Sequence, residues 1–171
     1  MTQRIRRGYD LPLDPAALVE RLRDRTVVER RSAVDGLGTR VAAHEPTAAG
    51  VRIVVATDLP VDWLPAIVRG RLTADPTVER TEEWAVEGDG AATPLTFVFA
   101  GMPVRGSGDA RLVPLPTGSR LDVEVDITVD VPLVGALVEA AVAPRIVAAL
   151  DAEAAFYGTL PLPASPGSVP P

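Results

Sequence analysis

The most regular pattern of hydrophobic and polar positions in the chain runs from residue 120 to residue 131. Apolar and polar residues alternate strictly here, and the apolar members are Leu121, Val123, Val125, Ile127, Val129 and Val131. Strict alternation is typical of a β-strand with one buried face and one solvent-facing face. At Pro132 the pattern changes to a long apolar run, rich in alanine, which predicts a helix that ends near Tyr157. A half-buried strand therefore leads directly into a long helix that can cover its apolar face.

The preceding part of the chain predicts one strand, two short helices and a series of strands. Asp14 is a good N-cap and Pro15 suits the first helical position, so we expect a helix over about residues 13–24. A second helix is expected within residues 25–38, where two glycines end it. Strands are expected at residues 3–10, 39–47, 50–60, 77–88, 93–101, 104–118 and 120–131, with a loop at 61–72.

These elements predict a single α+β domain. An antiparallel sheet with one apolar face must cover that face, and the long C-terminal helix is the large element available for it. Gly106 and Gly108 predict a bulge or bend in their strand, which helps a sheet to curve. We expect a curved antiparallel sheet of about six or seven strands, wrapped around the helix with a space between them. The domain is expected to span residues 1–158, followed by a disordered, proline-rich tail at 159–171.

Composition and charge exclude several classes of function. The net charge is −6 and the sequence pI about 4.8, which disfavours a nucleic-acid partner. All 17 basic residues are arginine and there is no cysteine, so lysine Schiff-base chemistry, thiol catalysis, disulfides and cysteine-ligated metals are excluded. We expect no cofactor and no metal. The sequence does not indicate an oligomeric state.

The chain start and the last apolar run bear on location. "MTQRIRRGYDL" lacks the apolar core of a signal peptide, so a cytoplasmic protein is expected. Residues 132–150 are the strongest membrane candidate, but Glu139, Pro144 and Arg145 interrupt them. We therefore expect a buried helix, kinked at Pro144, and no stable membrane insertion.

The alternating stretch "VERTEEWAV" holds the best candidates for a polar site. Arg80, Glu82 and Trp84 share one face with Val78 and Val86, and the apolar members indicate that this face is the inner one. A buried arginine needs a partner, which Glu82 could supply. In an apolar cavity the pair would be a polar anchor for a ligand. The alternative is that both side chains lie half-solvated at an open rim.

The apolar candidates come from the loop, the sheet and the long helix. Trp63, Leu64 and Ile67 could form a lid whose tryptophan contacts a ligand, a small satellite core under the loop, or an apolar patch for a partner. With the loop as a lid, a ligand would contact Trp63, Phe97, Val123, Val125, Ile127 and Leu137.

Two other sets of polar residues are expected to lie outside any site. Asp122, Glu124, Asp126 and Asp130 recur along one strand face about 6.6 Å apart, which suits a solvated outer face better than a calcium site. His44, the single histidine, is expected on an exposed strand face with Arg40 and Ala42, where catalysis would lack partners.

Four segments carry a resemblance to known proteins. They are "DLPVDWLP" (58–65), "VERTEEW" (78–84), "AGMPVRGSG" (100–108) and, most specifically, "VDVPLVGALVE" (129–139). With this order of elements, the chain resembles the START and polyketide-cyclase-like superfamily. Within it, the chain is most similar to an actinobacterial family catalogued as a domain of unknown function. The resemblance implies the helix-grip fold and a cavity for an apolar small molecule, lipid or polyketide-like compound. It implies no catalytic residues.

Three hypotheses of function remain open. The first is non-catalytic binding of an apolar small molecule or lipid between the sheet and the C-terminal helix. The second is a cyclase- or hydrolase-like enzyme in the same cavity, with Glu82, Arg80 or His44 in acid–base roles. The third is a regulatory or protein-interaction domain with a filled core. A continuous cavity well below about 300 Å³ would argue against the first two.

Overall fold

The computed structural model describes residues 2–64, 66–70, 72, 74–102, 104–129 and 135–162, with only the backbone for 67, 68 and 135–141. The helices are α1 (Pro15–Leu22), α2 (Arg25–Ser32), α3 (Ala66–Arg69) and α4 (Gly135–Gly158), with a 3-10 turn, η1, at Val61–Trp63. The strands are β1 (Thr2–Leu11), β2 (Arg40–Pro46), β3 (Gly50–Asp58), β4 (Thr77–Glu87), β5 (Gly90–Ala100), β6 (Val104–Pro114) and β7 (Ser119–Val129).

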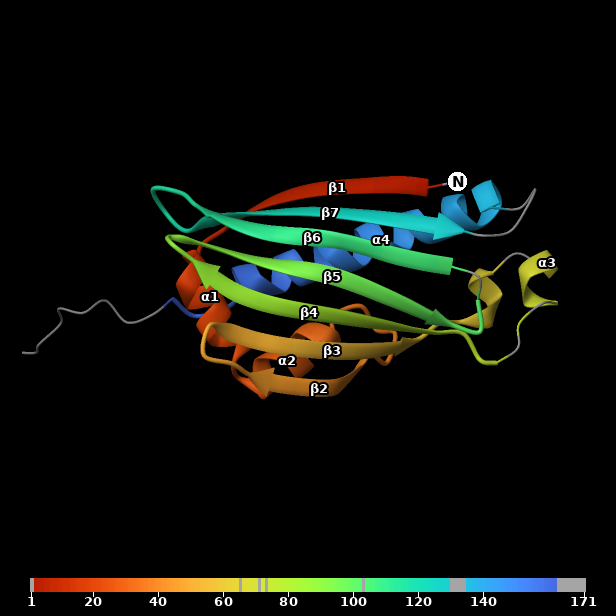
Figure 1. Ribbon diagram of the computed structural model, residues 1–171, viewed down its shortest axis with the longest axis horizontal. Coiled ribbons are helices and arrows are strands. Elements are labelled where there is room, and N and C mark those ends of the chain that lie inside the picture. Colours follow the sequence, from red (N-terminus) through yellow and green to blue (C-terminus); the bar gives the residue numbers. More distant parts are fainter. Residues whose placement is uncertain are drawn as a thin grey trace, which may run out of the picture.

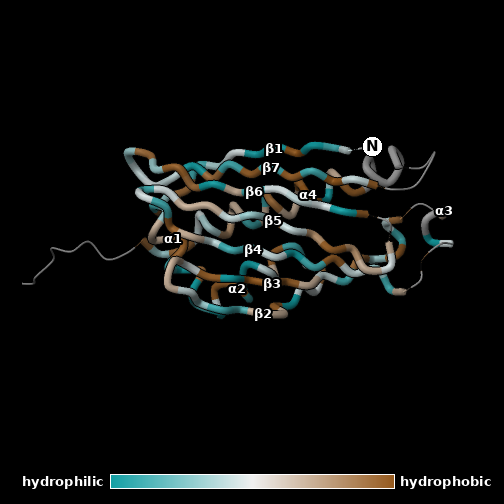
Figure 2. The backbone as a smooth tube through the Cα atoms, in the orientation of Figure 1, coloured by the Kyte–Doolittle hydropathy of each residue, from teal (hydrophilic) through white to brown (hydrophobic). Residues whose placement is uncertain are grey.

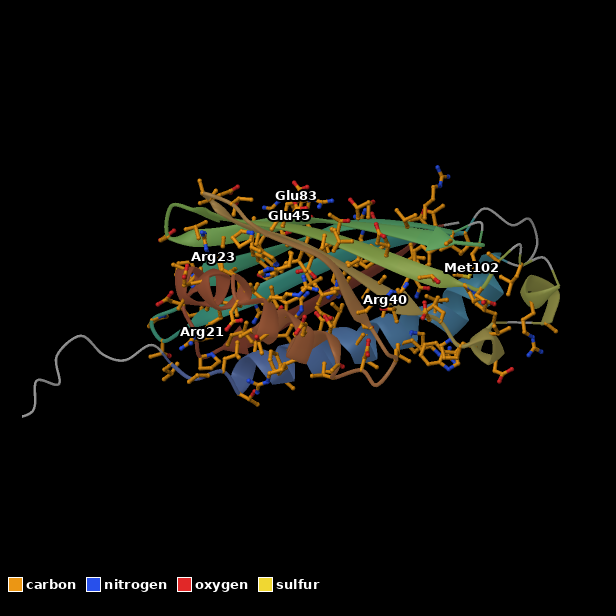
Figure 3. All side chains as sticks on the ribbon, turned by 90° about the horizontal axis from the view of Figure 1, so that it is seen from below. Arg21, Arg23, Arg40, Glu45, Glu83 and Met102 are labelled. Atoms are coloured by element: carbon orange, nitrogen blue, oxygen red, sulfur yellow. The ribbon has the colours of Figure 1, made fainter. Side chains whose placement is uncertain are left out.

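All seven strands form one antiparallel sheet in the order β1-β7-β6-β5-β4-β3-β2 (Figure 1). Helices α1, α2 and α4 lie on the same side of this sheet (Figure 3). The predicted architecture is confirmed: a curved antiparallel sheet, two short helices after the first strand, and a long C-terminal helix.

The two short helices begin where the sequence indicates. The side chain of Asp14 accepts a hydrogen bond from the Ala17 amide at 2.7 Å, and Leu18 and Leu22 are buried against the sheet. Helix α2 ends at Ser32, several residues before the glycines expected to end it. The chain then turns through Gly36 at φ 69°, where the side chain of Asp35 accepts a hydrogen bond from the Leu37 amide at 2.9 Å.

The alternation of the last strand is realised in β7. Its apolar residues from Leu121 to Val129 are buried and face the helices, and hydropathy alternates along the sheet (Figure 2). The acids lie on the outer face, where Arg4 contacts Asp126 at 2.8 Å and Arg6 pairs with Glu124. Asp130 lies outside the described residues. Ion pairs between side chains of β1 and β7 therefore cover this part of the outer face.

Of the bulge or bend predicted at the glycines of β6, the bulge is wrong. The pairing of β6 with β5 and with β7 keeps a single register along its length. The glycines are needed for close approach instead. A Cβ on Gly106 would lie 2.9 Å from Phe97 Cβ, and one on Gly108 would collide with the carbonyl oxygen of Glu124.

Helix α4 runs through Pro144 as one helix and packs mainly against β1 and β7. Within the described part of the chain, no helix combines the length and apolarity needed to cross a membrane. Beyond α4, Leu160 is 5% exposed and packs into the core, two residues past the expected domain end. Residues 163–171 of the expected tail lie outside the described residues.

Candidate functional site

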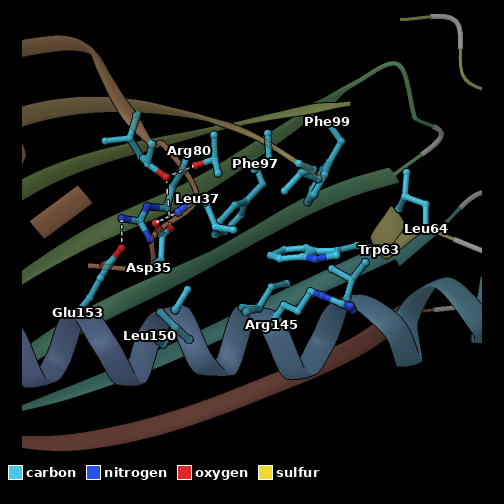
Figure 4. A pocket seen from close by; sticks show the side chains of 18 residues that line it. Asp35, Leu37, Trp63, Leu64, Arg80, Phe97, Phe99, Arg145, Leu150 and Glu153 are labelled. Atoms are coloured by element: carbon cyan, nitrogen blue, oxygen red, sulfur yellow. Dashed lines mark hydrogen bonds and ion pairs between the residues drawn. The ribbon is translucent and has the colours of Figure 1, made fainter. Parts of the chain in front are cut away.

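A cavity of about 120 Å³ lies between the inner face of the sheet and α4. Its wall comes from β3, β4, β5, η1, α4 and the loop between α2 and β2. The described lining residues are Asp35, Leu37, Thr39, Val55, Thr57, Leu59, Trp63, Leu64, Val78, Arg80, Phe97, Phe99, Val142, Arg145, Ile146, Ala149, Leu150 and Glu153. In Figure 4, Trp63, Phe97 and Phe99 lie towards one end, with Arg145 beside Trp63, and Asp35, Arg80 and Glu153 lie towards the other.

The aromatic end is formed by Trp63, Phe97 and Phe99. The guanidinium carbon of Arg145 lies 4.4 Å from the centre of the Trp63 ring, a cation–π contact between η1 and α4. Leu64 is 4% exposed and belongs to the core. Trp63 and Leu64 therefore form part of the cavity wall, and Leu64 is also packed into the core, whereas the side chain of Ile67 lies outside the described residues.

The polar end is organised by Arg80. Its Nη2 donates to Glu153 of α4 at 2.7 Å. Its Nε lies 2.9 Å from Glu82 Oε1, an ion pair without the alignment of a hydrogen bond. Arg80 therefore links the cavity to the charged groups behind it.

Behind Arg80 lies a buried polar network. Both terminal nitrogens of Arg31 donate to Glu82 at 2.9 Å, and one of them also donates to the Tyr157 hydroxyl at 3.0 Å. Trp84 Nε1 donates to the same carboxylate at 2.8 Å. The side chains of Arg31 and Glu82 are 1% and 3% exposed. The network joins α2, β4 and α4 through hydrogen-bonded charges.

The network sets the charge states of its members. Burial alone would raise the pKa of Glu82, but the positive charges of Arg31 and Arg80 outweigh burial and lower it to about 2. Burial likewise disfavours the charged form of Arg80, yet Glu153 and Glu82 raise its pKa. Burial raises the pKa of the Tyr157 hydroxyl to about 12. At neutral pH both guanidinium groups and the Glu82 carboxylate are charged, and the phenol is neutral.

A second cavity of about 30 Å³ lies beside this network, enough for one or two water molecules. Arg80, Leu150 and Glu153 line both cavities and so separate them. Val123 lines this smaller cavity.

The residues predicted from the sequence fall into three groups. Trp63, Arg80 and Phe97 line the main cavity. Glu82 and Trp84 lie behind Arg80 and line the small cavity. Val125 and Ile127 are core residues, 0% and 2% exposed, and are absent from the described walls of both cavities. The side chain of Leu137 lies outside the described residues. Val86, expected on the inner face, is exposed at the end of β4.

Sequence reasoning missed Arg31, Glu153 and Tyr157. Arg31 follows Val27 and Val28 by four and three residues, which places it on their buried helix face. Glu153 and Tyr157 are likewise four residues apart on α4. Helical spacing was thus a usable signal for all three, although it does not identify the partner strand.

The expectation that His44 is solvent-exposed is wrong. Its ring is half-buried, and Nε2 lies 2.9 Å from the carbonyl oxygen of Leu22 at the end of α1. A carbonyl only accepts hydrogen bonds, so Nε2 carries the proton and donates. His44 holds the end of a helix and is absent from the described wall of the cavity.

The sequence matches the family described as "Protein of unknown function (DUF2505)" over residues 8–159. No curated protein matches the sequence significantly.

Several solved structures share the fold. The Zhui aromatase/cyclase from Streptomyces sp. R1128 is 12% identical, with a TM-score of 0.55 over 92% of this chain and 94% of its own. A Chromobacterium violaceum protein is 16% identical, with a TM-score of 0.55 over 92% of this chain and 98% of its own. A Thermus thermophilus protein is 15% identical, with a TM-score of 0.52 over 92% of this chain and 94% of its own. At these identities the likeness shows the fold, which is the helix-grip fold predicted from the sequence.

Proposed function

This chain belongs to the family of proteins of unknown function (DUF2505), and we propose that it binds a small apolar molecule without catalysis. The observation that carries the proposal is the cavity between the sheet and α4. It has aromatic rings at one end and, at the other, Arg80, whose charge is paired with Glu153. Apolar walls with a few placed polar groups are typical of ligand sites.

The size of the cavity restricts the ligand. A volume of about 120 Å³ lies well below the roughly 300–1,000 Å³ of most ligand pockets, so it meets the condition that argues against binding of a whole lipid or polyketide and against an enzyme acting on one. It is close to the roughly 150 Å³ of an apolar cavity that holds benzene. The proposal is therefore limited to a molecule, or a molecular end, of about one ring. A whole lipid or polyketide is larger than this cavity.

The charge states favour binding over turnover. Glu82 remains ionised down to a pH of about 2 and is sealed by Arg31, Arg80 and Trp84. Arg80 stays charged, and His44 is bonded to a backbone carbonyl. Glu82 and Arg80 are therefore not poised to exchange a proton with a ligand near neutral pH, and His44 is absent from the described wall of the cavity.

The small volume also supports a second candidate function, a protein-interaction domain with a filled core. Ligand binding distinguishes the two. Burying about 150 Å² of a ring at about 25 cal/mol per Å² gives about 4 kcal/mol, or a Kd of about 1 mM. We expect toluene to bind at this level in a ligand-observed NMR titration.

A matched pair of variants tests whether binding uses this cavity. Ala149 lines the cavity, whereas the adjacent Ala148 is exposed on α4. Ala149→Leu fills part of the space and should weaken toluene binding by at least tenfold, whereas Ala148→Leu should leave it unchanged. Absence of binding to the wild type, or equal effects of the two variants, would support the filled-core function instead. If toluene binds in this cavity, native mass spectrometry of protein from its own host would then identify a retained ligand.

A further inference from the structure

We propose that the polar end of the cavity is a subsite for a hydrogen-bond donor, so that the preferred ligand is an uncharged aromatic molecule bearing a hydroxyl group. This inference rests on the proposed function and names its ligand class. It is carried by a chain of three side chains, Asp35, Thr39 and Thr57, all of which line the cavity.

The three side chains come from two elements that meet beside Arg80. Thr57 lies near the end of β3, paired with Val78, and two residues before it Val55 is paired with Arg80. Asp35 and Thr39 belong to the loop that leads from α2 into β2. Thr57 is 8% exposed, so its hydroxyl is largely removed from solvent.

The direction of the hydrogen bonds is set by the carboxylate, which only accepts. Asp35 Oδ1 is occupied by the Leu37 amide at 2.9 Å, and Oδ2 accepts from the Thr39 hydroxyl at 3.2 Å. The Thr39 proton is thereby used. The Thr39 and Thr57 hydroxyl oxygens lie 2.7 Å apart, so Thr57 donates to Thr39. Thr57 Oγ1 has no proton left to donate and offers the cavity only an acceptor.

Charge compensation makes the subsite suitable for an uncharged ligand. The charged groups among the described lining residues are two carboxylates, Asp35 and Glu153, and two guanidinium groups, Arg80 and Arg145, so their formal charges balance. Arg80 is held by Glu153, and Arg145 lies against the Trp63 ring. An ionic ligand would lose its hydration on entering a wall whose formal charges balance. A neutral hydroxyl loses less and can donate to Thr57.

The aromatic end of the cavity favours a ligand that contains an aromatic ring. Phe97, Phe99 and Trp63 present aromatic surfaces that pack well against another ring. A one-ring molecule also matches the volume of about 120 Å³. A phenol combines the ring and the donor.

Three probes of similar size distinguish the contribution of a hydrogen-bond donor to affinity from that of the aromatic ring. Phenol can donate a hydrogen bond, anisole can only accept one, and toluene does neither. We would measure the Kd of each by NMR titration for the wild type and for Thr57→Val. Thr57→Val keeps the shape but removes the acceptor. We expect the phenol-to-anisole preference to fall by about fivefold, the value of one net hydrogen bond, with toluene affinity unchanged within about twofold.

Asp35→Asn is the sharper variant, because it reverses the chain. The amide oxygen can still accept from the Leu37 amide, while the amide nitrogen replaces Oδ2 and donates to Thr39. Thr39 then donates to Thr57, and Thr57 donates into the cavity. We expect anisole to gain and phenol to lose affinity, each by about threefold to fivefold. Thr96→Val, at an exposed position of β5, is the control and should change none of the three affinities.

The outcomes separate this inference from the proposed function. If the wild type binds none of the three probes, the proposed function fails and the subsite with it. If all three bind, but the phenol-to-anisole ratio is the same in the wild type, Thr57→Val and Asp35→Asn, then the donor subsite alone is wrong. Retained toluene binding shows that each variant has folded, so a lost preference cannot be attributed to unfolding.

Discussion

At the scale of single residues, the most consequential position is Arg31. Its guanidinium group is 1% exposed and makes two hydrogen bonds to Glu82 and one to Tyr157. A buried ion pair gains its stability from good geometry, and removal of one partner leaves an uncompensated charge. The sequence of α2 is highly charged and suggests an exposed helix. Arg31 nevertheless contributes more to the stability of the fold than such a sequence indicates.

Arg31→Met should lower the free energy of unfolding by about 3–5 kcal/mol. Glu82 would keep Arg80 and Trp84 as partners but lose its bidentate one. Urea denaturation followed by circular dichroism measures the loss.

The double variant Arg31→Met, Glu82→Gln is the control for this prediction. It removes both charges and leaves Arg80 paired with Glu153, so it should recover most of the lost stability. If the single variant loses less than about 1 kcal/mol, or the double variant is no better, then the pair does not contribute as we infer.

At the scale of elements, strand β6 depends on its glycines. Gly108 is paired with Leu95 on one side and Val125 on the other, in an uninterrupted register. The sequence suggested a bulge or bend because glycine weakens a strand and is common at bulges and bends. The true cause lies in neighbours that are remote in the sequence, since the space for a Cβ is occupied by the Glu124 carbonyl.

Gly108→Ala should therefore lower the free energy of unfolding by about 1–3 kcal/mol, since the added methyl group forces β6 and β7 apart. Ser107→Ala is the matched control, because Ser107 is the preceding residue of the same strand and is exposed. Thermal denaturation of both variants is the measurement. Similar melting temperatures for the two would show that the strand accommodates the methyl group.

At the scale of the whole molecule, the buried network ties the sheet to helices on its inner side. Arg31 belongs to α2, Glu82 to β4, and Glu153 and Tyr157 to α4. The bonds made by Arg31 join residues that lie 51 and 126 positions apart along the chain. Protonation of the central carboxylate is thus expected to weaken the packing of the entire domain.

This linkage predicts how stability depends on pH. The pKa of Glu82 is lowered from 4.5 to about 2, so the unfolded chain binds more protons than the folded one between these values. The contribution of Glu82 is complete above about pH 5 and is lost as the pH falls towards about 2. The whole shift corresponds to about 3 kcal/mol, of which about 2 kcal/mol should be lost between about pH 6 and pH 3, where urea denaturation can measure it.

Glu82→Gln should be less stable at about pH 6 and should show a flatter dependence on pH. Asp58→Asn is the control, because Asp58 is an exposed carboxylate whose pKa is lowered by Arg40 and which lies outside the network. It should retain most of the slope. An unchanged slope in Glu82→Gln would place the acid sensitivity elsewhere.

The helices and strands, and the wrapping of a curved sheet around the long helix, could be predicted from the sequence alone. The alternation at 120–131 predicts a strand, and the N-cap of α1 and the long apolar run predict helices. These signals are local, because they depend on residues close together in the sequence. The sequence also indicated that Arg80, Glu82 and Trp84 face inwards, because residues two apart on a strand share a face.

Which charged groups pair with each other, and how large the cavity is, depend on the three-dimensional packing of the domain. The pairing of Glu82 with Arg31, the bond of His44 to Leu22, and the chain from Asp35 to Thr57 all join segments whose mutual position depends on how the sheet curves over the helices. The cavity volume likewise depends on the packing of many side chains at once. Periodicity reports which way a side chain points, whereas contacts between distant segments are set by the packing of the whole domain.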